Sequence, residues 1–252
     1  MGKKGGIRHL KRKPAPRVWS IERKQYTWIG KPSAGPHRMD QCITLTLSLR
    51  DLLGVAKTAK EAKTIISQGK VYVDGKIRKD ESYPAGLMDI VALPDSNRSY
   101  RVLPSSKGLI LHPIEKEEAG FKLCRIEDKS TVKNGHIQLD LHDGSNILVH
   151  VADPKKPTED TYHVLDTVKV GLKERGIQGY IKLAKDVPVL LVGGKNVGKH
   201  GKIVEIEESK GQKRRELLVT VEDNKGNRFQ TTMNFVFAVG ETSPSISLPE
   251  VK

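Results

Sequence analysis

The chain has 252 residues, which suits one to three domains that each bury a modest core. Its formal net charge is +14 and aromatic residues make up only 5% of it, so we expect several small β-rich units and a polyanionic partner. Cys42 and Cys124 form no metal-type pair, which argues for a reducing compartment and against a disulfide or zinc scaffold. No apolar run approaches the ~20 residues of a membrane span, and the N-terminus has no signal-type region, so we expect an intracellular protein without membrane contacts.

Residues 1–41 form a basic N-terminal arm, in which positions 1–38 hold eleven Lys and Arg against one acid, Glu22. Glycines and prolines interrupt this segment, so we expect it to be extended and disordered until a polyanion neutralises it. Its composition is turn-rich and serine-poor, unlike a mitochondrial transit peptide. Trp19 and Trp28 suit base stacking and equally suit packing of the arm on its own domain. The residues of the arm predicted to bind RNA are Lys3, Lys4, Arg8, Lys11, Arg12, Lys13, Arg17, Arg23 and Lys24.

Residues 42–93 open with a leucine-rich stretch that indicates a short helix ending near Gly54. Thr58 followed three residues later by Glu61 is a capping-box signature, which predicts that a second helix begins there. Gly69 stands where a glycine commonly ends such a helix. The pattern therefore predicts two helices joined by a short loop.

Alternating valines after Gly69, an Asp74-Gly75 turn and Ile77 predict a β-hairpin behind the second helix. Two helices followed by a hairpin with a basic face resemble the S4-type RNA-binding domain, and residues 58–80 carry that resemblance. The alternative is a small helical hairpin whose lysines are only a solvated face. The resemblance implies RNA binding by Lys57, Lys60, Lys63, Lys70, Lys76, Arg78 and Lys79.

The region that follows, which we bound as a central domain at residues 94–173, begins with a turn-rich stretch that predicts a linker over 94–108. From 109 to about 186 come short alternating runs separated by turn signals such as Asn134-Gly135 and Asp143-Gly144. Short strands at this spacing indicate a small barrel or sandwich. Acids balance the Lys and Arg here, so we interpret the region as a spacer and packing domain.

Residues 187–208 run from an apolar strand into a glycine-lysine loop that almost matches a phosphate-binding loop. His200 replaces the hydroxyl that would hold magnesium, and an alternating strand pattern follows where such a loop needs a helix N-terminus, so we reject nucleotide binding. Strand, glycine loop and strand resemble the KOW motif, found in SH3-like barrels of ribosomal and transcription-elongation proteins. An ordinary hairpin with exposed lysines is the alternative. The loop residues predicted to contact RNA are Lys195, Lys199 and Lys202.

Catalytic signatures are missing from the sequence. There is no H-E-x-x-H, Cys-x-x-Cys or G-x-S-x-G pattern, and the paired acids Asp140 and Asp143 fall at a hairpin turn. The sequence motifs of pseudouridine synthases and tyrosyl-tRNA synthetases, which also carry S4-type domains, are absent as well. We therefore predict no catalytic residue, no metal site, no cofactor and no small-molecule substrate.

The order of basic arm, S4-type module, β domain and KOW unit resembles the S4e family of small-subunit ribosomal proteins of archaea and eukaryotes. The resemblance rests on short motifs across the chain, among them Gly35-Pro36-His37, Gly86-Leu87-Met88-Asp89 and Leu141-His142-Asp143-Gly144. It implies a structural protein of the cytoplasmic ribosome that binds small-subunit ribosomal RNA, contacts neighbouring small-subunit proteins and supports assembly. The sequence ends soon after Leu248-Pro249, so we expect no eukaryotic C-terminal extension, which favours an archaeal source.

The expected fold is therefore α+β and multidomain: the arm, the S4-type module at 42–93, a central β-barrel or sandwich at 94–173, an SH3-like KOW barrel at 174–240 and a tail at 241–252. The alternative functions are an RNA-modifying enzyme or an RNA chaperone with an S4-type module. A transcription factor that uses the KOW unit is a third possibility.

Overall fold

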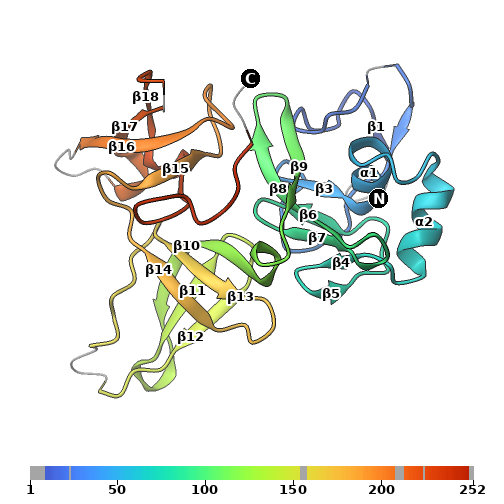
Figure 1. The fold of residues 1–252 in the computed structure, drawn as a ribbon. Helices are drawn as coiled ribbons and strands as arrows, with labels where there is room; N and C mark the ends of the chain where they lie inside the picture. Colours follow the sequence, from blue (N-terminus) through green and yellow to red (C-terminus); the bar gives the residue numbers. More distant parts are fainter. Residues whose placement is uncertain (1–8, 23, 154–157, 208–212, 224, 250–252) are drawn as a thin grey trace, which may run out of the picture. The chain divides into compact units, whose positions relative to one another are not determined.

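The computed structural model describes residues 9–249 except positions 23, 154–157, 208–212 and 224 (Figure 1). The chain divides into two compact units, one containing the segment up to Leu103 together with Lys107–Pro113, the other containing Pro104–Ser106 and the chain from Ile114 onward. None of the helices in the described part is both long and apolar enough to cross a bilayer.

The N-terminal segment is folded from residue 9 onward, so the expectation of a disordered arm is wrong for its described residues. A short strand β1 (Leu10–Lys11) pairs antiparallel with β2 (Trp28–Ile29). Trp19, Ile21 and Ile29 are buried in the core of the first unit. Burial of each such side chain contributes roughly 1.5–3 kcal/mol. This gain offsets the entropy cost of ordering the segment, which we had expected to dominate because of its charge and proline content.

The two predicted helical segments come next in the chain, and local hydrogen bonds fix the start of the second one. The Thr58 hydroxyl accepts a hydrogen bond from the Glu61 N–H at 3.2 Å. Glu61 in turn accepts from the N–H of Lys57 at 2.8 Å, one residue before the cap, so the capping box is confirmed with a shifted return bond. Gly69 has a φ of +78° just past the helix end, as predicted. The elements are β3 (Cys42–Thr44), α1 (Leu45–Leu47), a π-helical turn (Ser48–Leu52) and α2 (Ala59–Ser67).

A five-stranded sheet in the order β5-β4-β7-β8-β9 completes the first unit, and β3 pairs separately with β6. Asp74 and Gly75 have φ values of 49° and 74°, which fits the primed turn expected of this dipeptide. The linker predicted over 94–108 is wrong, because most of it belongs to β8 and β9. Val102 and Leu103 are fully buried in β8, a signal masked by the flanking arginines and serines. The bounds are β4 (Tyr72–Val73), β5 (Lys76–Ile77), β6 (Pro84–Gly86), β7 (Ile90–Leu93), β8 (Arg98–Ser105) and β9 (Gly108–Ile114).

The second unit begins with an antiparallel sheet in the order β12-β11-β10-β13-β14. The long strand β10 pairs with β13 through its first half and with β11 through its second half, with a bulge between Ile126 and Asp128. Its core contains Ile126, Leu139 and Val168. The bounds are β10 (Phe121–Thr131), β11 (Ile137–Leu141), β12 (Asn146–Val149), β13 (Thr167–Gly171) and β14 (Ile177–Ile181).

A second antiparallel sheet of this unit has the order β18-β17-β16-β15-β19, so the last strand lies beside the first. The segment after the glycine-lysine loop is the strand β16, and the helix required by a phosphate-binding loop is not formed there, as predicted. The bounds are β15 (Pro188–Leu191), β16 (His200–Glu207), β17 (Leu218–Glu222), β18 (Arg228–Thr232) and β19 (Val236–Ala238).

Candidate nucleic-acid interface

Helix α2 turns its lysines to solvent because the opposite face is apolar. Ala62 and Ile66 are fully buried, whereas Lys57, just before the helix, and Lys60, in its first turn, are exposed. Neither lysine makes an ion pair within the described residues. Their charge is therefore available to an external anion.

Two further lysines of the module already face acids on its surface. Lys63 lies 3.0 Å from Glu81, and Lys70 lies 3.0 Å from Asp95. All four side chains are at least one third exposed, and exposed pairs of this kind contribute about 0–1 kcal/mol. A phosphate group can therefore replace the acid at little cost.

The hairpin contributes three cations of different character. Lys76 and Lys79 are exposed, but Arg78 is half-buried with its guanidinium 4.4 Å from the ring centroid of Tyr83. Stacking on the ring fixes the direction of the guanidinium. Of the hairpin residues predicted to bind RNA, Lys76 and Lys79 thus stay on the surface, whereas Arg78 is partly covered.

The N-terminal segment contains both exposed cations and one cation that makes structural hydrogen bonds. Lys13, Arg17 and Lys24 are exposed. The Arg12 guanidinium instead donates to the backbone carbonyls of Ile21 at 2.6 Å and Glu22 at 3.3 Å, which closes the loop between β1 and β2. Arg12 therefore holds the segment together. Four other predicted residues lie outside the described part of the chain: Lys3, Lys4, Arg8 and Arg23.

In the second unit, the glycine-lysine loop presents Lys195 and, on β16, Lys202 to solvent. Lys199 is half-buried, with its ammonium group 3.7 Å from the ring centroid of Phe229 and 3.1 Å from the Asn196 amide oxygen. This lysine packs the loop against the sheet. Cations of the second unit thus divide between surface and interior in the same way as those of the N-terminal segment.

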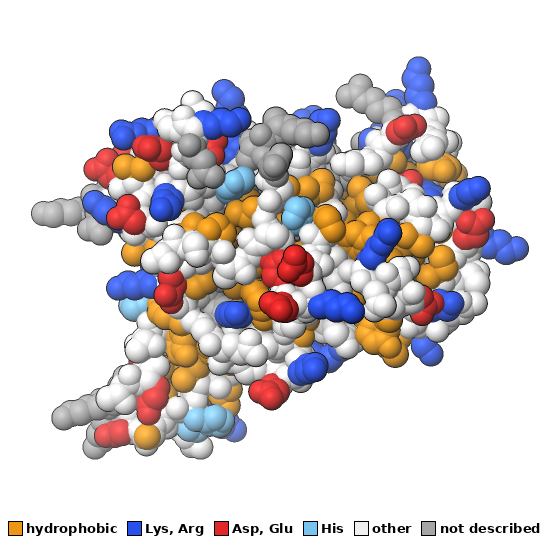
Figure 2. All heavy atoms as spheres, in the orientation of Figure 1, with side chains coloured by type: hydrophobic (Ala, Val, Ile, Leu, Met, Phe, Trp, Pro, Cys, Tyr) orange, Lys and Arg blue, Asp and Glu red, His pale blue; other side chains and the backbone are white. Residues whose placement is uncertain are grey.

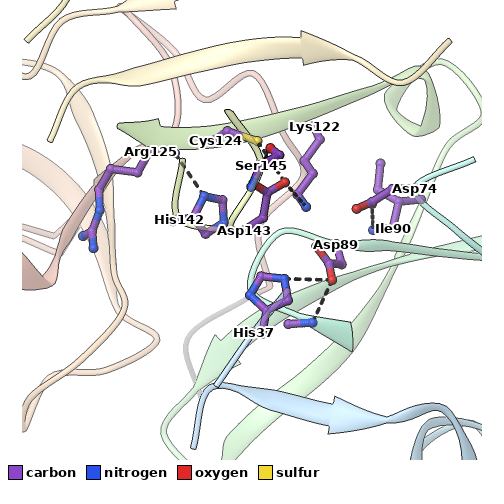
Figure 3. A network of polar contacts seen from close by, with 11 residues as sticks. His37, Asp74, Asp89, Ile90, Lys122, Cys124, Arg125, His142, Asp143 and Ser145 are labelled. Carbon is purple, nitrogen blue, oxygen red and sulfur yellow. Dashed lines mark hydrogen bonds and ion pairs between the residues drawn. The ribbon is translucent and has the colours of Figure 1, made fainter. Parts of the chain in front are cut away.

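A buried contact between a histidine and an aspartate anchors the segment that precedes the helices, a feature that sequence reasoning missed. His37 Nε2 lies 3.0 Å from Asp89 Oδ2, and the same oxygen accepts from the Gly86 N–H at 2.9 Å (Figure 3). A Cβ atom on Gly86 would come within 2.2 Å of the His37 ring. The Gly35-Pro36-His37 motif is therefore a packing motif of the first unit.

A second buried pair lies in the second unit. Asp143 Oδ2 is 3.0 Å from the Lys122 ammonium nitrogen, and Oδ1 accepts from the N–H of Ser145 at 3.0 Å (Figure 3). Burial by itself raises the pKa of Asp143, but the positive charge of Lys122 and the hydrogen bonds from Ser145 outweigh it and hold that pKa well below its usual value. The expected turn role of Asp143 is confirmed, and the ion pair adds to it.

Other cations of the second unit serve its interior. Asp166 is fully buried and accepts from Arg214 at 2.8 Å, from the Leu183 N–H at 3.0 Å and from the Tyr180 hydroxyl. Burial, and then the hydrogen bond to this carboxylate, raise the pKa of Tyr180. Arg125 donates to the carbonyl of Asn234 at 2.7 Å. These contacts join the two sheets of the unit.

The described residues contain no cluster of three or more His, Cys, Asp or Glu side chains that could hold a metal ion. Both cysteines are free and buried, and burial, with smaller contributions from two aspartates, raises the pKa of Cys42 to about 12.

On the face drawn in Figure 2, Lys and Arg side chains are spread singly among acidic ones. The geometry therefore supports a distributed anion-binding surface.

Three family models match the chain. Residues 4–40 match the RS4NT (NUC023) domain, residues 52–91 match the S4 domain, and residues 96–177 match the ribosomal family S4e. Fold and matched domains together define an S4-domain protein of ribosomal type.

Similarity to individual proteins extends over the full length. The chain is 49% identical to the small ribosomal subunit protein eS4 of Staphylothermus marinus and 48% identical to that of Desulfurococcus amylolyticus, covering 99% of both chains in each comparison. The crystal structure of the 30S ribosomal protein S4e from Thermoplasma acidophilum matches with a TM-score of 0.66 at 29% identity, covering 81% of this chain and 97% of that one. The chain belongs to the S4e family of ribosomal proteins, as its motifs predicted.

Proposed function

We propose that the chain is a structural constituent of the small ribosomal subunit that binds ribosomal RNA and supports assembly of the subunit in the cytoplasm. The observation that carries this proposal is that Lys57 and Lys60, at the start of α2, are exposed and form no ion pair with any residue that the structure describes. When such lysines contact phosphates, counterions are released from the RNA, which supplies a large share of the binding free energy.

Recognition in this proposal depends on shape. The helical module and its hairpin present cations on a rigid surface, and folded RNA is read mostly through its backbone and the geometry of its grooves. The cations that we assign to phosphate contact are the half-buried Arg78 and the exposed Lys11, Lys13, Arg17, Lys24, Lys57, Lys60, Lys63, Lys70, Lys76, Lys79, Lys195 and Lys202. Arg12 and Lys199 act by holding loops in place.

The second unit has the character of a bracing element. The sheet formed by β15 to β19 and the glycine-lysine loop support an SH3-like KOW domain within residues 174–240, although β14 pairs with the other sheet. Lys122, Arg125 and Arg214 are engaged in internal contacts, which leaves fewer cations for phosphates. We assign to this unit the contacts with neighbouring small-subunit proteins. No residue is assigned a catalytic role.

The test is sedimentation of a cell extract, followed by quantification of this protein across the gradient. One copy per small subunit that survives moderate salt supports the proposal. Substoichiometric and transient association would favour an RNA chaperone, and modification of naked ribosomal RNA by the purified chain would favour an enzyme. Absence from the particles, together with no RNA binding at low ionic strength, would overturn it.

A further inference from the structure

The two tryptophans of the N-terminal segment have opposite environments. Trp19 is 3% exposed, and its indole N–H donates to the carbonyl of Cys42, so it belongs to the core. Trp28 is 58% exposed, the largest exposed fraction among the large apolar side chains of the described residues. An exposed indole forgoes a large hydrophobic gain, and a ligand that covers it would recover that gain.

The pairing of β1 with β2 fixes this exposure. Leu10 lies opposite Ile29 and both are buried, whereas Lys11 lies opposite Trp28 and both are exposed. Because side chains alternate across a strand, burying the first pair forces the second pair to the other face. The indole is thus held outward by the register of two strands.

A lysine and a histidine lie against the exposed indole. The Lys11 ammonium nitrogen lies 5.2 Å from the ring centroid, and the His9 ring meets the indole edge-on at 5.7 Å between centroids. Lys11 lies over the ring, and more than half of the Trp28 surface remains exposed. Nearby in the sequence, Lys13 and Lys24 are also exposed.

We propose that Trp28 and Lys11 form a stacking site for one unpaired base of RNA, with the base on the indole and the adjoining phosphate at Lys11. The proposal rests on the proposed function, since it names where one nucleotide of the RNA is bound. A flat, uncharged ring beside the ammonium group of Lys11 complements a flat base joined to an anionic backbone, whereas an apolar protein groove would have to bury the charge of Lys11. The base must be unpaired, because only a splayed base presents a free face.

The test uses the full-length chain and short single-stranded oligoadenylate as the probe. Trp28→Ala should weaken binding about 5- to 150-fold, the range that one stacked base contributes. Trp28→Tyr keeps an aromatic face and should restore most of the affinity, whereas Trp28→Leu keeps apolar area without that face and should not. Lys11→Gln should reduce the slope of log affinity against log salt by about 0.7, a change that Trp28→Ala should not produce.

Fluorescence provides an independent readout. Oligoadenylate should quench the emission of the wild-type chain and leave that of Trp28→Tyr, which retains only buried Trp19, nearly unchanged. Heparin, a polyanion without bases, should bind without comparable quenching. Leu218→Ala, which also removes an exposed apolar side chain, is the matched control and should bind like the wild type.

The outcomes distinguish failure of the stacking site from failure of the proposed function. If Trp28→Ala and Trp28→Leu bind oligoadenylate as tightly as the wild type, the stacking site is wrong while the proposed function stands. Equal quenching by heparin would also overturn the stacking site. If the wild-type chain binds neither oligoadenylate nor ribosomal RNA at low salt, the proposed function fails with it.

Discussion

The imidazole of His37 and the carboxylate of Asp89 form a buried pair, with Nε2 of the former 3.0 Å from Oδ2 of the latter. The pair joins the segment before the helices to the turn between β6 and β7. Since Asp89 also accepts from the backbone of Gly86, a single carboxylate fixes two chain segments.

Replacing His37 should therefore destabilise the first unit. His37→Ala removes a partner of a buried carboxylate, and we expect a loss of about 1–3 kcal/mol in the free energy of unfolding. Denaturant unfolding measures the loss. Arg38→Ala, at the neighbouring exposed position, is the control and should change stability by less than about 0.5 kcal/mol. Equal effects of the two variants would contradict an anchoring role for His37.

The N-terminal segment should behave as part of the first unit. Trp19→Ala should cost about 3–5 kcal/mol, because it opens a cavity in the core and removes the donor to the Cys42 carbonyl. Trp28→Ala, at an exposed indole, should cost less than about 1 kcal/mol. For the same reason, deletion of residues 1–38 should unfold the first unit and not merely weaken RNA binding. A deletion variant with unchanged thermal stability would disprove this.

The Lys122–Asp143 pair should give the second unit a defined response to acid. The pKa of Asp143 is lowered in the folded chain, so its contribution to stability is complete above its ordinary pKa and is lost as the pH falls. The stability difference between wild type and Asp143→Asn should thus be largest at neutral pH and shrink below about pH 4. Thermal unfolding across the acid range checks this. Asp95→Asn, in an exposed pair, should show no comparable difference at neutral pH.

The salt dependence of RNA binding should report the exposed lysines at and just before the start of α2. Lys57→Gln and Lys60→Gln together should lower the slope of log affinity against log salt by about 1.4–1.8, since each phosphate contact contributes about 0.7–0.9. Filter binding to small-subunit ribosomal RNA at several salt concentrations gives the slope. Lys116→Gln with Lys173→Gln removes two exposed cations from the second unit outside the proposed contacts and should leave the slope unchanged.

Replacing Lys195 and replacing Lys199, both in the glycine-lysine loop, should change different properties: RNA binding for Lys195 and stability for Lys199. Lys195→Gln should lower the salt slope by one contact, because this side chain is exposed. Lys199→Gln should instead lower the thermal stability of the second unit, because its ammonium group rests on Phe229. If Lys199→Gln changes the slope and leaves stability intact, the assignment of Lys199 as a packing residue is wrong.

Local signals in the sequence predicted the local structure well. The cap at Thr58, the glycine at position 69 and the Asp74-Gly75 turn each depend on neighbours within a few residues, so they are visible without the fold. The strand after the glycine-lysine loop was predicted for the same reason. The family resemblance then supplied the function that these elements alone do not specify.

Contacts between distant segments were the part that could not be predicted. Composition predicted a disordered arm because the arm has few apolar residues. Residues such as Trp19 stabilise it by packing into a core formed by distant segments, which composition does not reveal. The linker expectation failed on Val102 and Leu103 in the same way. Lys199 and Arg12 looked like phosphate ligands because sequence gives charge but not the ring or carbonyl that engages it.

The N-terminal segment also makes a distant backbone contact, since the N–H of Leu109 donates to the carbonyl of Val18 at 2.8 Å. At Gly108 an added Cβ would meet the same carbonyl at 2.2 Å, so only glycine permits the approach. During translation, position 18 leaves the exit tunnel long before position 109 has been polymerised. The nascent chain must therefore wait for nearly half its length before its first core can close, and its basic stretch is open to nucleic acid throughout that interval.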